Sequence, residues 1–142
     1  MQTRLNPYLS FQGNAEEVVA FYQEIFGGNL TKSTFAEGGM PHDPAEANWI
    51  MHAMLETENG MVLMASDTPT SMEFKPGSNG AISLSGDNEP ELRGYYEKLS
   101  AGGTATLPLS AAPWGDAFGM CTDKYGINWM VNISGVSDSA QE

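Results

Sequence analysis

An internal repeat constrains this chain more than any other feature. Residues 9–14 (LSFQGN) match residues 82–87 (ISLSGD) at an offset of 73 positions. Alternating residues predict strands over 8–12 and 82–87, and apolar residues at helical spacing predict a helix over 15–26 and another ending at Leu99. Asn14 and Asp87 stand where N-caps are expected, and paired glycines follow each helix. A strand leading into an amphipathic helix therefore occurs twice.

A β-hairpin follows each strand-helix pair. The first is predicted from residues 52–58 and 61–66 around Asn59-Gly60, and the second from residues 118–122 and 127–133 around residues 123–126. Together these elements predict an α+β fold of two tandem β-α-β-β-β modules, with a cupped mixed sheet and the helices packed outside it. We expect one domain over 1–142, in which module 1 (about 5–67) and module 2 (about 80–134) are joined by a loop (68–79). The polar tail 135–142 is predicted to be disordered.

Composition narrows the classes of partner. Six Lys and Arg against 18 Asp and Glu give a formal net charge of -12, which disfavours nucleic acid as a partner. No apolar run approaches the roughly 18 residues of a membrane span, and the N-terminus lacks the residue order of a signal peptide. With a single cysteine, Cys121, these observations predict a cytoplasmic protein without a membrane partner. We expect Cys121 to be a buried, unreactive strand residue because only Lys124 is a nearby base.

Strand alternation divides the side chains between two faces. In the first strand, Leu9 and Phe11 are expected to meet the helix, whereas Tyr8 and Ser10 face away from it. In the last strand, we place the odd-numbered apolar residues, including Trp129, against a helix and the even-numbered residues 128, 130 and 132 in the cup. A sheet face that is partly polar and free of a helix is suited to binding a small ligand.

The repeat and its motifs resemble those of a known family. The likeness rests on Phe21-Tyr22 in the first helix, the paired glycines, and a terminal hairpin of the form D-x-x-G-x-x-W over residues 123–129. The chain resembles the vicinal oxygen chelate superfamily, which includes glyoxalase I, bleomycin-resistance proteins and extradiol dioxygenases. Residues 7–11, 13–15, 52–53, 118–119 and 129–132, with Trp114, are most similar to the PhnB-like branch. The resemblance implies a homodimer.

The resemblance also implies positions for a divalent metal ion. The ligand positions of metal-dependent members fall at Tyr8 (or Pro7), Met64, Ala81 and Met130 of this chain. Thioether and methyl side chains are poor ligands for a divalent ion that prefers nitrogen or oxygen donors. We therefore predict no cofactor, and the residues at these positions do not support a divalent metal.

His52 and Glu56 form the one acid-base pair that the sequence suggests near the cup. A two-residue turn at Asn59-Gly60 would place Leu55 opposite Met64, which puts His52 and Glu56 on the face away from the cup. A longer turn would reverse the two faces. The two residues are thus the candidate catalytic residues of this chain.

Three functions are compatible with these features. The first is a metal-free small-molecule binder of unknown ligand, the second an enzyme of the lyase or dioxygenase type with a shifted metal or a His52-centred acid-base site, and the third a non-catalytic interaction module. Loops 36–48 and 68–79 are either lids or ordinary surface connections. We favour the first function. Its candidate ligand-binding residues are Tyr8, Ser10, Met64, Trp114, Phe118, Met130 and Asn132.

Overall fold

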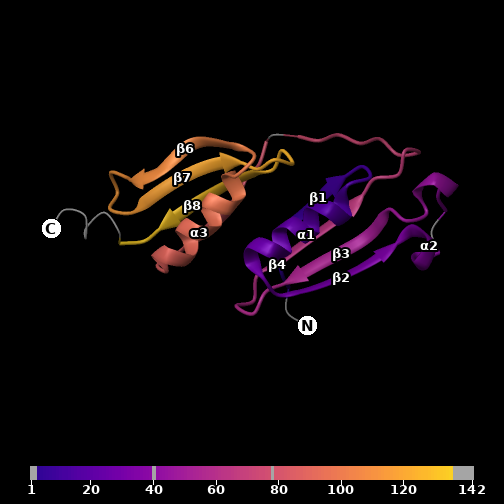
Figure 1. Ribbon diagram of the computed structural model, residues 1–142, viewed down its shortest axis with the longest axis horizontal. Helices are drawn as coiled ribbons and strands as arrows, with labels where there is room; N and C mark the ends of the chain where they lie inside the picture. Colours follow the sequence, from indigo (N-terminus) through magenta and orange to yellow (C-terminus); the bar gives the residue numbers. More distant parts are fainter. Residues whose placement is uncertain (1–2, 40, 78, 136–142) are drawn as a thin grey trace. The chain divides into compact units, whose positions relative to one another are not determined.

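The first half of the chain forms a four-stranded sheet with one long helix against it (Figure 1). In order, its elements are β1 (Tyr8–Phe11), α1 (Ala15–Phe26), β2 (Asn29–Thr34), the short helix α2 (Phe35–Gly38), the 3-10 helix η1 (Pro44–Glu46), β3 (Ile50–Glu56) and β4 (Val62–Asp67). The strand order is β1-β4-β3-β2, in which β1 pairs with β4 in parallel and the other pairs are antiparallel. The sheet is therefore mixed.

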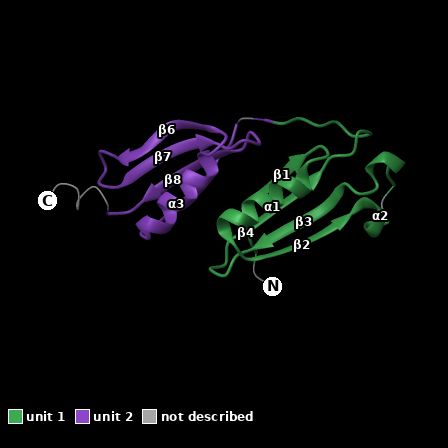
Figure 2. Ribbon diagram, viewed as in Figure 1, with its two compact units in different colours: residues 1–76 green, residues 77–142 purple. Residues whose placement is uncertain are grey.

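The second half repeats this arrangement. Its elements are β5 (Ile82–Gly86), α3 (Glu89–Ser100), β6 (Thr104–Ala111), β7 (Ala117–Thr122) and β8 (Asn128–Ile133), with strand order β5-β8-β7-β6. The computed structural model describes residues 3–39, 41–77 and 79–135, and the chain divides into two compact units at residues 76 and 77 (Figure 2). We call them unit 1 and unit 2. The predicted α+β fold of two β-α-β-β-β modules is confirmed.

The long helices α1 and α3 each cover one face of their own sheet. Val18, Val19 and Tyr22 of α1 are fully buried, as are Ala53 and Leu55 of β3. In unit 2, the helix residues Leu92, Tyr96 and Leu99 are buried, and so are Trp129, Val131 and Ile133 of β8. The prediction that Trp129 faces a helix is confirmed. Within the described residues, neither α1 nor α3 covers the opposite face of its sheet, and we call that face the open face of the unit.

The predicted N-cap of the first helix is confirmed in position, whereas that of the second helix was wrong. Asn14 stands at the N-cap of α1, but its side chain makes no capping hydrogen bond. The carboxylate of Asp67, at the end of β4, accepts from the backbone N–H groups of Gly13 (2.8 Å) and Ala15 (3.0 Å) instead. In unit 2 the cap is Asn88 rather than Asp87, because its Oδ1 accepts from the N–H of Glu91 (3.2 Å).

Both hairpin loops are one residue longer than a two-residue turn. In the first, Thr57 pairs with Met61 and Gly60 lies at φ +87°; in the second, Asp123 pairs with Ile127 and Gly126 lies at φ +88°. A three-residue loop that ends in a left-handed glycine is a common hairpin connection. The register therefore shifts by one, and Met54 rather than Leu55 lies opposite Met64.

The second glycine of the pair after each helix is required by a close approach of the backbone. A Cβ on Gly28 would lie 2.3 Å from the carbonyl oxygen of Glu56, and one on Gly103 would lie 2.1 Å from that of Thr122. The chain just before β2 thus lies against the end of β3, and the chain just before β6 lies against the end of β7. The β-α-β-β-β pattern predicted a strand after each helix. The residues of β2 and β6 are mostly polar or exposed and do not alternate clearly, so the sequence did not predict the bounds of these strands.

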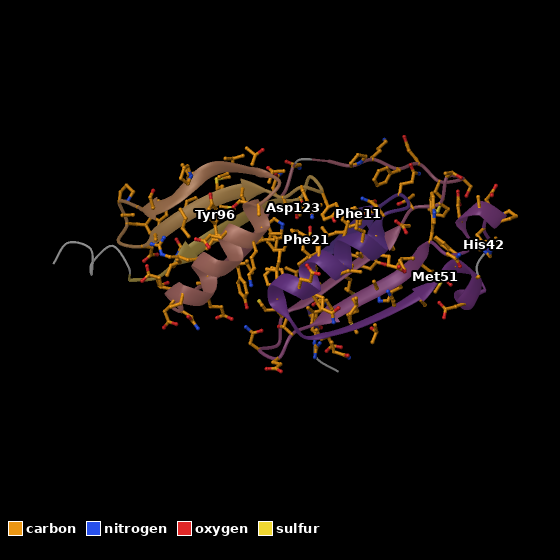
Figure 3. The ribbon with its side chains drawn as sticks, viewed as in Figure 1. Phe11, Phe21, His42, Met51, Tyr96 and Asp123 are labelled. Carbon is orange, nitrogen blue, oxygen red and sulfur yellow. The ribbon has the colours of Figure 1, made fainter. Side chains whose placement is uncertain are left out.

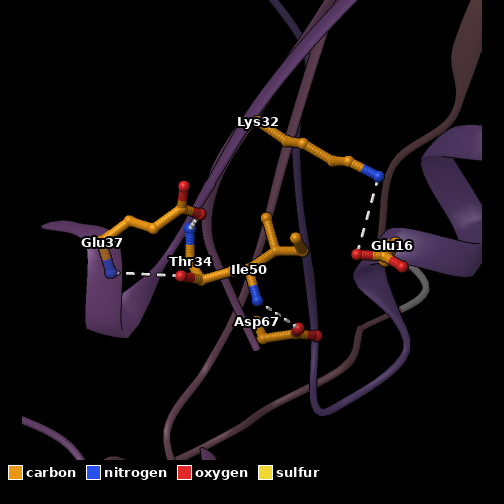
Figure 4. Close-up of polar contacts among 6 residues, drawn as sticks. All are labelled: Glu16, Lys32, Thr34, Glu37, Ile50 and Asp67. Carbon is orange, nitrogen blue, oxygen red and sulfur yellow. Dashed lines mark hydrogen bonds and ion pairs between the residues drawn. The ribbon is translucent and has the colours of Figure 1, made fainter. Parts of the chain in front are cut away.

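The two predicted loops differ from simple connections. Residues 36–48 contain most of α2 and all of η1, and α2 begins with a capping box between Thr34 and Glu37 (Figure 4). The buried carboxylate of Glu46 accepts hydrogen bonds from the backbone N–H and the hydroxyl of Thr70. The two loops are therefore joined within unit 1.

Of the tail predicted to be disordered, only Gly135 is described, and residues 136–142 lie outside the described residues. Across residues 3–39, 41–77 and 79–135, no helix has the length and apolar character needed to cross a membrane.

Cys121 is buried in β7, as predicted, with 1% of its surface exposed. Burial, together with the charge of Asp123, raises the pKa of its thiol from an ordinary value of 9.0 to about 11. At a pH below both values, the native thiolate fraction is about 100-fold smaller than that of the unfolded chain. We expect iodoacetamide to modify the native protein at least about 100-fold more slowly than the urea-unfolded protein at pH 8. Equal rates, measured by mass spectrometry, would contradict this burial.

The same shift predicts how stability depends on pH. The folded thiol keeps its proton to a higher pH than the unfolded thiol, so the folded state binds more protons between pH 9 and about 11. The contribution of Cys121 to the free energy of unfolding therefore decreases as the pH rises through this window.

Candidate functional site

The open face of unit 1 is formed by side chains of β1, β4 and β3. Across the sheet, Tyr8 lies opposite Met64, which in turn lies opposite Met54. Because Ala53 and Leu55 are buried against α1, alternation places His52, Met54 and Glu56 on the open face. This corrects the placement expected from a two-residue turn, and the extra loop residue is the reason.

Tyr8 and His52 are in direct contact on this face. The Tyr8 hydroxyl lies 3.1 Å from Nδ1 of His52, and the two ring centroids are 5.8 Å apart at 36°. Tyr8 is 47% exposed. The contact holds one nitrogen of the imidazole and orients the ring, while the tyrosine stays open to a ligand. Neither the sequence spacing nor the resemblance suggested this pair, which is separated by 44 positions.

The predicted acid-base pair of His52 and Glu56 is not assembled as such. Four residues along a strand separate the two Cα atoms by about 13 Å, and the hydrogen-bond partner of His52 within the described residues is Tyr8.

Two other polar residues lie elsewhere in unit 1. Ser10 lies next to Ser66 and is exposed. The ring of the other histidine, His42, stacks on that of Phe35. Figure 3 labels His42, which lies near α2.

The open face of unit 2 has a similar pattern. Met120 lies opposite Met130, and Phe118 lies opposite Asn132. Thr122 donates a hydrogen bond to the side chain of its partner Asn128 (2.8 Å). At an offset of 66 residues, the pair Met120–Met130 corresponds to Met54–Met64 of unit 1. Each open face therefore has two thioethers side by side on neighbouring strands.

A hydrogen-bonded chain of side chains lies at the end of the open face of unit 2. The indole Nε1 of Trp114 donates to Oδ1 of Asn132 (3.2 Å), and Nδ2 of Asn132 donates to Asp116 (2.9 Å). The rings of Trp114 and Phe118 meet edge to face at 5.5 Å. The structure thus brings together Trp114, Phe118 and Asn132, which the sequence had proposed as ligand-binding residues.

Asp116 is the member of this group that the sequence did not indicate. The hydrogen bond from Asn132 lowers the pKa of its carboxyl group most, and those from the backbone of Gly135 and from Trp114 act in the same direction. An ionised carboxylate therefore lies next to the exposed indole. In the sequence, the one indication of a role for Asp116 was its position between Trp114 and the apolar strand β7. Ordinary loop residues often have such a position.

The residues at the family's metal-ligand positions do not fit a divalent ion. Tyr8 and Met64 are neighbours, as the family pattern implies, whereas Met130 lies beside Ser83 rather than Ala81. A phenol, two thioethers and a methyl or hydroxyl group are unsuitable for Zn²⁺, Mn²⁺ or Fe²⁺. Among the described residues, no three or more His, Cys, Asp or Glu side chains are placed to hold a metal ion.

The motif that carried the resemblance stabilises the fold. Asp123 is 3% exposed, and its carboxylate accepts from Nε1 of Trp129 (2.9 Å) and from the backbone N–H groups of Tyr125 and Ile127. Tyr96 of α3 donates to the backbone carbonyls of Leu107 and Met120, which ties the helix to the same sheet (Figure 3). Asp123 and Trp129 of this motif are thus buried away from the open face.

Comparison with known proteins agrees with this fold. Residues 4–131 match the model of the Glyoxalase/Bleomycin resistance protein/Dioxygenase superfamily. The Escherichia coli (strain K12) protein YjdN is 30% identical, over 91% of this chain and 94% of that protein. Among solved structures, protein PA1353 from Pseudomonas aeruginosa has 33% identity and a TM-score of 0.81, covering 94% of this chain and 98% of that one. The PhnB protein from Bacillus cereus has 26% identity and a TM-score of 0.74, covering 93% and 100%.

Proposed function

Because the chain belongs to the glyoxalase/bleomycin resistance protein/dioxygenase superfamily, we propose that it binds a small organic molecule without a divalent metal ion. The ligand-binding surface that we propose is the open face of unit 2 around Trp114, Phe118, Met130 and Asn132. Tyr8, Ser10 and Met64 form the corresponding surface on the open face of unit 1.

The exposed indole of Trp114 carries this proposal. The side chain is 60% exposed, yet its Nε1 and its ring edge are both held by neighbouring side chains. A large aromatic ring that is held in place and left open to solvent is a surface on which another planar ring can stack at little cost in conformational entropy. Met130 and Met120, two residues along their strands from Asn132 and Phe118, add adaptable apolar side chains to the same face.

The neighbouring charge indicates which ligands fit best. The ionised Asp116 accepts hydrogen bonds, and an indole face attracts cations. The formal net charge of -12 acts in the same direction over longer distances. The proposed ligand is therefore a planar aromatic compound that carries an amine or another positively charged N–H donor.

Thermal-shift and tryptophan-fluorescence titrations test this proposal. The panel pairs planar aromatic amines with neutral analogues of the same ring, each with and without EDTA. We expect an amine to raise the melting temperature in both conditions, and we expect Trp114→Ala to abolish that shift. Met72→Ala is the matched control, because Met72 is also 60% exposed and lies in unit 1.

The other functions remain as outcomes of the same titration. Binding that needs a divalent metal, or that survives Trp114→Ala unchanged, contradicts the proposal. If no member of the panel binds, the non-catalytic interaction module is supported instead. The contact between Tyr8 and His52 favours a second candidate, acid-base catalysis on the open face of unit 1.

We also propose a partner and a cellular compartment. The edge strands β2 and β6 expose unpaired backbone groups that a second copy can cover, and we propose a homodimer, to be tested by light scattering. The single cysteine agrees with a reducing cytoplasm.

A further inference from the structure

We propose that the open face of unit 1 binds a soft monovalent metal ion, Cu(I), through the thioethers of Met54 and Met64 and the imidazole of His52. This site differs from the divalent site of the family in its ion and in two of its donors. It also differs from the ligand surface proposed for unit 2, so either can fail without the other.

The sheet register brings the two thioethers together. Met54 and Met64 are direct partners in the antiparallel pair of β3 and β4. Side chains at such positions have Cβ atoms about 4.5–5.5 Å apart on the same face. Both residues are partly exposed, and a methionine side chain has three rotatable bonds. The two sulfur atoms can therefore approach one ion without any change in the backbone.

His52 provides the third donor. It lies two residues before Met54 on the same face of β3, a Cα separation of about 7 Å. Its Nδ1 is held by the Tyr8 hydroxyl at 3.1 Å, and Tyr8 is the partner of Met64 on the other side of β4. Imidazoles that bind metals typically have their second nitrogen held in this way, which fixes the tautomer and the ring orientation. Nε2 then remains as the donor atom.

The donor set selects the ion. Thioethers are soft ligands that favour Cu(I), and imidazole suits copper, whereas Mg²⁺, Ca²⁺ and Mn²⁺ prefer oxygen donors. Two neutral sulfurs and one neutral nitrogen do not offset the single positive charge of Cu(I). The negative net charge of the chain favours a bound cation over longer distances.

Unit 2 contains a built-in comparison for this site. Its pair Met120–Met130 corresponds to Met54–Met64, but Phe118 stands in place of His52, and Ser83, the partner of Met130 on β5, in place of Tyr8. The same fold thus presents two thioethers with the imidazole in one module and without it in the other. We expect Cu(I) to bind to unit 1 and not to unit 2.

Cu(I) titration under anaerobic conditions with ascorbate, in competition with a chromophoric Cu(I) chelator, tests this proposal. The experiments use a Cys121→Ala background because thiolates also bind Cu(I). We expect one equivalent to bind, and Met54→Leu or Met64→Leu to weaken binding by about 100-fold, with Tyr8→Phe weakening it by about 10-fold. His52→Phe, which copies unit 2, is expected to weaken it as strongly as the loss of a thioether.

Met120→Leu and Met130→Leu are the matched controls, and they should leave the affinity unchanged. Methionine-to-leucine changes nearly conserve volume, so the variants are expected to fold. In the same Cys121→Ala background, with Met54 and Met64 intact and methionines labelled with ¹³C in the methyl group, Ag(I) should shift the signals of these two methionines. Retained affinity in Met54→Leu/Met64→Leu, equal losses in the Met120 and Met130 variants, or shifts confined to other methionines would overturn the proposal.

Discussion

Replacing Asp67 with alanine is expected to lower the free energy of unfolding by about 4 kcal/mol. Asp67 is 3% exposed, and its carboxylate accepts hydrogen bonds from the backbone N–H groups of Gly13, Ala15 and Ile50. Figure 4 shows the contact with Ile50, at 2.9 Å. One side chain thus joins the end of β4 to the start of β3 and to the turn between β1 and α1.

The size of this effect follows from the groups that alanine would leave without a partner. The hydrogen bonds at Ala15 and Ile50 are buried, so no water replaces the lost acceptor. Each unsatisfied buried N–H costs about 1–3 kcal/mol. Asp67→Asn keeps one acceptor oxygen but turns an amide N–H toward a backbone donor, and we expect about half of the loss.

Urea unfolding followed by circular dichroism measures the effect. Asp43→Ala is the matched control. The carboxylate of Asp43 likewise accepts from a backbone N–H, that of Ala45 at 2.9 Å, but this hydrogen bond is exposed. Its expected cost is about 1 kcal/mol or less. If Asp67→Ala is no more destabilising than this control, the carboxylate does not join these elements as described.

The second large effect is expected at Asp123. Asp123→Ala should lower the free energy of unfolding by about 3 kcal/mol, since it removes the acceptor for the buried indole N–H of Trp129 and for two N–H groups of the hairpin loop. In unit 1 the corresponding residue is Thr57, whose hydroxyl accepts from the N–H of Met61 at 3.0 Å. The loop is therefore held by a weaker contact there.

A double-mutant cycle separates the contact with Trp129 from the contacts within the loop. Trp129→Phe removes the donor and keeps an aromatic ring, and the coupling between the two changes is expected to be about 1.5 kcal/mol. Additive effects would show that Asp123 acts through the loop alone. Ligand binding to the open face of unit 2 should change little, because both residues are buried on the other side of the sheet.

These two carboxylates explain why the resemblance and the candidate site are separate properties of this chain. Asp123, Gly126 and Trp129 form the motif that is similar to the superfamily, yet they hold a hairpin and a core. The side chains on the open faces, such as Met64 and Met130, occupy the ligand positions of metal-dependent relatives and differ from them. A shared motif can thus be retained for stability while the site changes.

Local patterns determined most of the fold. The periodicity of residues 15–26 predicted α1 with its observed bounds, because an amphipathic helix needs only its own apolar spacing and its end signals. The repeat at offsets of 73 and 66 predicted two modules, and alternation predicted that Trp129 is buried while Met130 faces the other way. Each of these inferences depends on neighbours within a few residues.

Tertiary structure alone decided the details of the candidate site. One additional residue in the loop after Thr57 moved His52 and Met54 to the open face, since a shift of one residue exchanges the two faces of a strand. The contact of Tyr8 with His52, and that of Asp67 with the start of α1, join residues more than 40 positions apart. The sequence by itself determined which elements form and which of their faces are apolar, because those properties are local. The register between elements decided which side chains meet.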